Sequence, residues 1–400
     1  MRPYDGRRIL LGVSGGIAAY KAGWLSRLLA HAGAEVDVVM TRAATEFVGP
    51  VTFEGLTGRD VHTDIFARGR ALDHIRLARA AHAVVVAPAT ADFMARAAQG
   101  RADDLLAACL LATEAPVLIV PAMNDRMWAH PQTRANASRL REIGYRLLEP
   151  EEGMLAAGEG IGPGRMPEPE TIFAHVGRLL ERQDLAWRRV VVTAGATREP
   201  LDPVRFISNR SSGKMGVALA VAAWRRGADV TLVAGTLEIP LPVGSTVVRV
   251  ETTDEMADAV AHALPGADAL VMAAAPADFR PERMAEQKIK KSSSPESLSL
   301  APTRDILAAT IPCRRPGAVV VGFALETENL LANARQKLEG KALDLIVANS
   351  AMEEGSVFGA DTNRVTIIGR EGGAEELSLR PKSEVADAIL DRVEALLRER

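Results

Sequence analysis

The feature that most constrains this chain is a repeated pattern in which a short apolar run stops at small residues and a helical pattern follows. In the first half, such runs occupy residues 9–13, 35–40, 83–87 and 116–120, and in the second half residues 190–193, 229–234 and 270–275. Continuous apolar runs indicate strands buried on both faces, and helices between them connect parallel strands. The pattern predicts an α/β fold with mostly parallel sheets in Rossmann-like, three-layer domains.

The length of the chain predicts two such domains. Its 400 residues exceed the usual size of one domain. A helical pattern at 168–183 is followed by Trp187, Arg188 and Arg189, so we expect a boundary near 184–188 and domains at 1–187 and 188–400. Near the C-terminus we expect a strand at 365–368 and an exposed helix at 383–398 without a chemical role.

Composition narrows the class of protein. A formal net charge of −3 argues against a general nucleic-acid binder. Two cysteines, Cys109 and Cys313, provide neither a disulfide framework nor paired zinc ligands, which fits a reducing compartment. No run reaches membrane-spanning length, and the N-terminus lacks a signal-type apolar region. We therefore predict a soluble cytoplasmic protein that binds neither nucleic acid nor membranes.

A long polar loop follows the strand at 190–193 and leads into a helix near Lys214. It contains groups that bind anions: Arg198, Arg205, Arg210, Asn209, Ser211 and Ser212. The carboxyl edge of a parallel sheet is where α/β proteins bind ligands, and a helix start favours phosphate. Met215 follows Lys214 where a P-loop needs a hydroxyl, so this is not a P-loop. The loop predicts a phosphate site of another kind, or else a solvated basic loop.

Residues 207–216, read after 193–205, closely resemble the phosphopantothenate cysteine ligase half of the bacterial bifunctional coenzyme A biosynthesis proteins. The family also matches at 287–291, with Asp278 ten residues before Lys288, and at 305–307, 322–323, Lys337, Lys341 and the predicted strand 345–349. Arg304 departs from the family, in which proline is usual there. Taken alone, 287–294 is typical of a solvated β-arm, and Asp278 of a helix or turn cap.

This resemblance implies that the chain joins L-cysteine to 4'-phosphopantothenate through an acyl-cytidylate made from CTP, with Mg²⁺. Asn209 would stabilise the acyl-cytidylate step, Lys288 its formation, and Asp278 would help to place the metal. Cationic side chains are needed because a triphosphate and a carboxylate repel each other. The resemblance assigns substrate and CTP binding to Ala275, Asp278, Lys288, Arg304, Asp305, Ile306, Leu307, Phe323, Lys337, Lys341, Arg205 and Arg210.

The first half contains small residues after two of its predicted strands. Ser14, Gly15 and Gly16 form a turn whose backbone N–H groups can approach a phosphate, although such turns often serve only close packing. Residues 88–92 offer a floor for a flat ring, and Thr41 begins the second helix as a cap.

Four segments, at 15–17, 73–75, 87–90 and 121–124, resemble the flavin-dependent cysteine decarboxylases. The resemblance implies a flavodoxin-like domain that decarboxylates 4'-phosphopantothenoylcysteine to 4'-phosphopantetheine, with His74 as the catalytic base and Asn124 holding the carboxylate. Without it, His74 would be a helix-surface residue and Asn124 a turn residue. FMN would contact Ser14, Gly15, Ile17, Thr41, Ala89 and Thr90.

Two positions depart from the decarboxylase pattern. Asp92 stands where asparagine is usual, and Ala157 replaces the cysteine that donates a proton from the flexible clamp at 153–165. The main hypothesis is a bifunctional enzyme and homo-oligomer. The alternative is an active ligase fused to an FMN-binding domain with an impaired decarboxylase. A nicotinamide dehydrogenase is the weakest interpretation, because neither half has a full G-x-G-x-x-G followed by an acidic residue.

Overall fold

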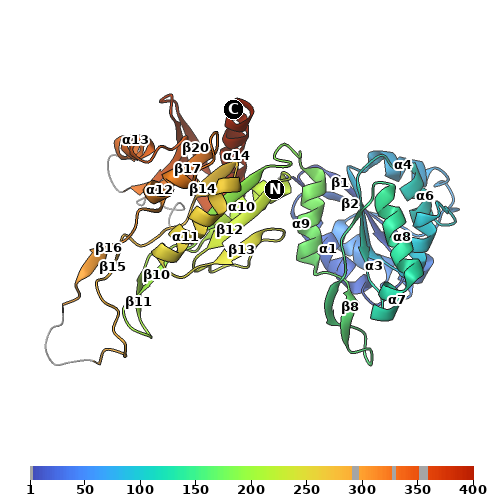
Figure 1. Ribbon diagram of the computed structural model, residues 1–400. Helices are drawn as coiled ribbons and strands as arrows, with labels where there is room; N and C mark the ends of the chain where they lie inside the picture. The colour runs from blue at the N-terminus through green and yellow to red at the C-terminus, as the bar shows by residue number, and fades with distance from the viewer. Residues whose placement is uncertain (1–2, 291–296, 327–329, 351–358) are drawn as a thin grey trace. The chain divides into compact units, whose positions relative to one another are not determined.

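The computed structural model describes residues 3–290, 297–326, 330–350 and 359–400. It divides into two compact units, Met1–Glu181 and Arg182–Arg400, which we call the N-terminal and C-terminal units. Each has a mostly parallel sheet with helices against it (Figure 1), which confirms the predicted fold class. The sequence-based division into 1–187 and 188–400 stays a prediction.

The N-terminal unit has a six-stranded parallel sheet in the order β3-β2-β1-β4-β5-β6. Its strands are β1 (Arg8–Val13), β2 (Glu35–Met40), β3 (Val61–His62), β4 (Ala83–Ala89), β5 (Val117–Pro121) and β6 (Arg146–Leu147). Its helices are α1 (Ala19–His31), α2 (Arg42–Thr45), α3 (Pro50–Thr57), α4 (Asp73–Ala80), α5 (Ala91–Ala98), α6 (Leu105–Ala112), α7 (Asp125–Ala129), α8 (Pro131–Glu142) and α9 (Pro169–Leu180).

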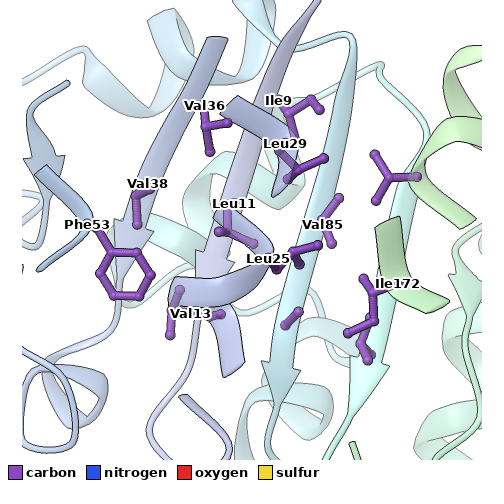
Figure 2. Close-up of a cluster of buried hydrophobic side chains, with 14 of the residues drawn as sticks. Ile9, Leu11, Val13, Leu25, Leu29, Val36, Val38, Phe53, Val85 and Ile172 are labelled. Atoms are coloured by element: carbon purple, nitrogen blue, oxygen red, sulfur yellow. The ribbon is translucent and has the colours of Figure 1, made fainter. Parts of the chain in front are cut away.

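Each face of this sheet has its own hydrophobic core. Side chains alternate along β1, so Ile9 and Leu11 enter one core and Leu10 the other. Figure 2 shows the first core, in which residues of β1, β2 and β4 meet Leu25 of α1, Phe53 of α3 and Ile172 of α9. Burial on both faces explains why these strands are continuously apolar in the sequence.

The C-terminal unit has an eight-stranded sheet in the order β13-β12-β9-β14-β17-β18-β19-β20, antiparallel only at β19 and β20. Its strands are β9 (Arg189–Ala194), β12 (Asp229–Ala234), β13 (Thr246–Arg249), β14 (Ala269–Met272), β17 (Val319–Glu326), β18 (Leu345–Ser350), β19 (Thr362–Gly369) and β20 (Ala374–Pro381). Its α-helices are α10 (Lys214–Arg225), α11 (Thr253–Ala263), α12 (Ile306–Ala309), α13 (Leu330–Gly340) and α14 (Lys382–Arg398).

Among the described residues, three small two-stranded sheets lie outside the two main sheets. The pairs β10 (Arg198–Pro200) with β11 (Phe206–Ser208), and β15 (Phe279–Pro281) with β16 (Leu300–Pro302), extend from the C-terminal unit (Figure 1). The pair β7 (Glu151–Met154) with β8 (Ile161–Arg165) extends from the N-terminal unit. The clamp predicted to be a flexible stretch at 153–165 is therefore a hydrogen-bonded hairpin.

Several predicted elements of the C-terminal unit are corrected by the structure. The strand expected at 270–275 ends at Met272, which leaves residues 273–275 as a loop. The helix at the C-terminus is not exposed, because its apolar face, including Val385 and Ile389, is fully buried and the helix packs on α10. Residues 287–290 form no strand, and residues 291–294 of the expected β-arm lie outside the described residues.

A buried ion pair joins α10 to α14. Arg225 Nη2 lies 2.6 Å from Asp387 Oδ1, and each side chain is 8% exposed. Arg226, the residue after α10, pairs with Asp184 before β9 and with Asp391 of α14, each at 2.8 Å. These contacts connect the beginning of the C-terminal unit to its last helix.

We predict that Asp387→Ala destabilises the C-terminal unit by about 3–5 kcal/mol, because the guanidinium of Arg225 would stay buried without its carboxylate. Glu375→Ala, which removes an exposed partner of Arg392, is the matched control and should cost less than about 1 kcal/mol. Hydrogen exchange of α10 and α14 peptides in the full-length protein measures both effects. Equal losses of protection in the two variants would contradict this view of the buried pair.

Candidate functional site

In the N-terminal unit, Ser14 joins the carboxyl ends of β1 and β4. Its hydroxyl donates to the Pro88 carbonyl at 2.8 Å and accepts the N–H of Thr90 at 3.0 Å. Thr90 in turn caps α5 by accepting the N–H of Phe93 at 3.2 Å. The Ser14 hydroxyl therefore donates its proton within the protein. A ligand at this edge would instead be bound by the backbone N–H groups of the following turn.

Small residues make this edge of the sheet flat and close-packed. A Cβ on Gly15 would lie 2.4 Å from the Cβ of Ala43, so the turn can only be formed by glycine there. Thr41 caps α2 by accepting the N–H of Ala44 at 3.3 Å, and Ala89 is fully buried. The predicted contacts Ser14, Gly15, Thr41, Ala89 and Thr90 thus come together, and Ile17 is exposed at the end of the turn. Hydroxyls, turn N–H groups and a floor of small residues suit a flat ring that carries a phosphate.

His74 lies in the first turn of α4, at the same edge of the sheet. Asp73 beside it contacts the ring Nδ1 of His62 at 2.9 Å, and His62 ends β3. Burial lowers the pKa of His62, and the nearby Asp73 carboxylate partly offsets this. The Nδ1 of His74 is buried and has no hydrogen-bond partner among the described residues. The helix α4, which carries His74, connects β3 to β4 and also contacts β1. The role of His74 as the catalytic base stays a prediction.

Asn124 caps α7 and is tied to the same edge. Its side chain accepts the N–H of Arg126 at 2.9 Å, and the preceding Ala122 donates its N–H to the Ala89 carbonyl at 3.1 Å. The N–H of Met123 donates to the Gly164 carbonyl at 3.0 Å, which fixes the β7–β8 hairpin to the Asn124 turn. Ala157 lies exposed near the tip of that hairpin.

The C-terminal unit contains a cavity of about 410 Å³. Residues of the loops at 209–215 and 273–278 line it, and so does Asn349 of β18. Asn209 holds one wall by donating its amide to the Pro276 carbonyl at 2.9 Å and the Ala275 carbonyl at 3.3 Å. Asp278 and Phe323 also line it. Four of the predicted site residues, Asn209, Ala275, Asp278 and Phe323, therefore share one cavity.

Other predicted residues lie outside the lining of this cavity. Arg205 donates to Asp202 at 2.6 Å and to the Ile289 carbonyl at 2.8 Å. The hydrogen bond from Arg205 holds the pKa of Asp202 well below its usual range. Arg304 pairs with Asp258 at 2.7 Å. The remaining residues outside the lining are Arg210, Lys288, Asp305, Ile306, Leu307, Lys337 and Lys341.

The residues around 305 form a small cluster of their own. Lys341 Nζ lies 3.0 Å from Asp305 Oδ2, and Asp305 caps α12 by accepting the N–H of Ala308 at 3.1 Å. The side chains of Ile306 and Leu307 are buried in the hydrophobic core, so these two residues can offer a ligand only their backbone.

The cavity also has lining residues that the sequence did not single out. Lys382 begins α14 in a stretch to which no chemistry is assigned, and Asn363 lies at the beginning of β19. Asn349, near the end of β18, belongs to a strand that matches the ligase family but has no assigned role. Lys214 appeared in the predicted phosphate loop but was not assigned to the site. No local signal marks Lys382, because the antiparallel pairing of β19 with β20, which sets Pro381 opposite Thr362, places Lys382 beside the cavity.

A buried hydrogen-bond network fixes the loops that form the cavity wall. Glu199 accepts the N–H of Thr253 at 2.8 Å and its hydroxyl at 2.7 Å. The hydroxyls of Thr253 and Thr197 are 2.9 Å apart, and Thr197 accepts the N–H of Ala277 at 2.9 Å. The loop after β9 is thereby bonded to the loop that carries Asp278. We name Thr197, Glu199, Thr253 and Ala277 the loop network.

The described residues contain no group of three or more His, Cys, Asp or Glu side chains that could hold a metal ion. Mg²⁺ is often held by one or two carboxylates together with phosphates, so Asp278 as its ligand stays a prediction. In the same part of the chain, no helix is long and apolar enough to cross a membrane.

The comparisons with known proteins cover both units. A family model described as Flavoprotein matches residues 1–181, and one described as DNA/pantothenate metabolism flavoprotein C-terminal domain matches residues 185–397. The chain is 47% identical to the coenzyme A biosynthesis bifunctional protein CoaBC of Mycobacterium bovis over 98% of this chain and 97% of that protein.

The protein of the same name from Bacillus subtilis is 42% identical over 99% of this chain and 98% of its own length. A crystal structure of the C-terminal domain of a coenzyme A biosynthesis bifunctional protein CoaBC matches 55% of this chain and all of that chain, with 36% identity and a TM-score of 0.47.

We predict that Glu199→Ala loosens both loops joined by the loop network, because the N–H and the hydroxyl of Thr253 would lose their acceptor. Each unsatisfied buried group should lower the stability of the unit by about 1–3 kcal/mol. Glu199→Gln keeps an acceptor oxygen and should cost clearly less. Hydrogen exchange of peptides that cover 194–200 and 274–278 measures the difference. If the two variants exchange alike, the carboxylate does not hold these loops.

Proposed function

The chain belongs to the family of coenzyme A biosynthesis bifunctional proteins, and from this premise we propose that its C-terminal unit joins L-cysteine to 4'-phosphopantothenate and its N-terminal unit decarboxylates the product to 4'-phosphopantetheine. One observation carries the proposal: the relatives and the structure agree. Relatives of that name match this chain over nearly their whole length, and each unit holds several predicted site residues at one edge of its sheet. The alternative of an impaired decarboxylase has no support from these relatives, which are named as bifunctional proteins of coenzyme A biosynthesis.

For the ligase we assign CTP as the nucleotide, so that the carboxylate is activated as an acyl-cytidylate. Asn209, with its amide already held against the cavity wall, would orient the acyl group. Lys288, Lys337 and Lys341 would neutralise the triphosphate, and the backbone at 305–307 would contact the nucleotide. We assign Mg²⁺ to Asp278 together with nucleotide phosphates, which supply most of its ligands in many enzymes. We also keep Arg205, Arg210 and Arg304 as proposed substrate-binding residues, although in this structure Arg205 pairs with Asp202 and Arg304 with Asp258.

For the decarboxylase we assign FMN to the edge that Ser14, Thr41 and Thr90 hold together, because its turn and floor of small residues fit a phosphate and a flat ring. When bound, FMN supplies a reversible acceptor of hydride for the carbon that carries sulfur. His74 would hold and move the substrate proton, and Asn124 would hold the substrate carboxylate. The β7–β8 hairpin, bonded to the Asn124 turn, would cover the substrate.

We further propose that the protein acts as a homo-oligomer in the cytoplasm. In the N-terminal unit, α1, α3 and the turn before α3 expose large apolar side chains, as expected of a surface that another subunit covers. These are Tyr20, Trp24, Phe47 and Val51. Both cysteines are free thiols, which supports a reducing compartment.

We predict that Asn209→Ala and His74→Ala separate the two activities in the full-length protein. Asn209→Ala should stop formation of 4'-phosphopantothenoylcysteine while decarboxylation of added 4'-phosphopantothenoylcysteine continues. His74→Ala should do the reverse, slowing CO₂ release by about 10²–10⁴-fold, because a general base contributes that much. Pyrophosphate and CO₂ release are measured for both variants. A His74 variant that loses its yellow flavin colour would indicate a structural role instead.

We also predict that Ala157→Cys speeds formation of 4'-phosphopantetheine, because a positioned proton donor typically contributes about 10²–10⁴-fold to rate. CO₂ release should not change, because the new thiol would act only in the last protonation. Ala157→Ser is the control for size. Product mass and CO₂ are followed in one single-turnover reaction. Unchanged kinetics in the cysteine variant would mean that another group already delivers this proton.

A further inference from the structure

The cavity of the C-terminal unit has a cationic end where two helices begin. Lys214 is the first residue of α10 and Lys382 the first residue of α14, and both line the cavity. Lys214 Nζ donates to the Gly359 carbonyl at 2.6 Å and to Asp361 Oδ1 at 2.7 Å. Lys382 Nζ donates to the Thr362 carbonyl at 2.8 Å and to the Ala360 carbonyl. The two ammonium groups therefore converge on one short segment, 359–362.

The two ammonium groups at this end of the cavity repel each other. Burial lowers the pKa of Lys382, the charge of Lys214 lowers it further, and Asp361 offsets only part of this. The Asp361 side chain is 89% exposed, so water screens much of the compensation that it gives. An anion bound between the lysines would relieve this repulsion.

Donors remain for such an anion. An ammonium group has three N–H donors, and the contacts above use two of each. Within the described part of the chain, neither helix has a side-chain cap, so N–H groups of both first turns add positive potential at the same place. Ser211 and Asn349 extend the polar lining.

We propose that Lys382 and Lys214 bind the phosphate monoester of the acid substrate, and that Lys382 thereby makes the ligase select a phosphorylated acid over the same acid without phosphate. The inference rests on the proposed ligase function and names the part of its cavity that determines specificity. Lys382 acts as a binding residue for a group remote from the reacting carboxylate.

The arrangement of the predicted residues favours the phosphate of the acid over those of the nucleotide. Of the residues assigned to the nucleotide and its metal, Asp278 lines this cavity, whereas Asp305 and Lys341 pair with each other outside its lining. Asn209, assigned to the acyl group, lies on the cavity wall beside Ala275 and Pro276. A cavity of about 410 Å³ is in the range that encloses a small ligand, so the acid can reach from Asn209 to the lysines.

A purely structural role makes a different prediction. If Lys382 served only to hold the segment 359–362 through its carbonyls, its removal would weaken the binding of every ligand of this cavity to a similar degree. If it binds the phosphate, the loss is confined to the phosphorylated acid. The ratio of two affinities in one variant therefore separates the two roles.

The test is calorimetric titration of the full-length protein with 4'-phosphopantothenate and, by displacement, with pantothenate. Lys382→Met removes the charge and keeps the length of the side chain, and Lys382→Arg keeps the charge. Arg392→Met removes a cation from an exposed position of the same helix and serves as the matched control. Thermal unfolding and CTP binding are measured for each variant to monitor folding.

We expect Lys382→Met to weaken 4'-phosphopantothenate about ten- to hundredfold, as the loss of a hydrogen bond to a charged group does. Pantothenate and CTP affinities should stay unchanged, Lys382→Arg should retain most of the affinity, and Arg392→Met should match the wild type. Equal weakening of both acids, or no change for either, would overturn the proposal. Pyrophosphate release by the wild type is recorded separately, so that a failure of the ligase function is distinguished from a failure of this phosphate site.

Discussion

The C-terminal unit depends on one buried carboxylate. Glu199 accepts both donors of Thr253, and through Thr197 the same chain of hydrogen bonds reaches the N–H of Ala277. A parallel sheet fixes its strands but leaves the loops at its carboxyl edge without ladder partners. The loop network supplies those partners, and it joins the loop after β9 to the loop that carries Asp278. Without the loop network, the polar loop after β9 would contain the same residues but would lose its fixed position beside the loop that carries Asp278.

In the N-terminal unit, a single hydroxyl group connects the loops at the carboxyl edge of the sheet. Ser14 bonds to Pro88 and Thr90, so the turn after β1 and the small-residue floor after β4 form one rigid edge. Backbone contacts extend this edge to the Asn124 turn and to the β7–β8 hairpin. In both units the regular sheet provides the scaffold and a few buried polar contacts determine the site. Such contacts are worth most where water is excluded.

Local patterns predicted most of the fold, because continuous apolar strands and glycine stops are properties of neighbouring residues. The same holds for Ser14, Gly15 and Thr90, which occur in short motifs and lie together in the structure. Lys382 was missed because the pairing of β19 with β20, which cannot be read from local sequence, places it beside residues 359–362. The C-terminal helix was judged exposed because the pairing of Arg225 with Asp387 cannot be inferred from either segment alone. The assigned roles of His74 and Lys288 rest on resemblance, and their positions among the described residues leave them predictions.

The central claim is that one chain carries out two consecutive reactions on the same substrate. It is tested most directly by mass spectrometry of one reaction that contains the wild-type protein, FMN, 4'-phosphopantothenate, CTP, Mg²⁺ and cysteine labelled with ¹³C in its carboxyl group. The account predicts that labelled 4'-phosphopantothenoylcysteine appears with an equal amount of pyrophosphate, and that its label then leaves as ¹³CO₂ while unlabelled 4'-phosphopantetheine accumulates. Pyrophosphate release without the labelled adduct, or an adduct that keeps its label, would contradict it.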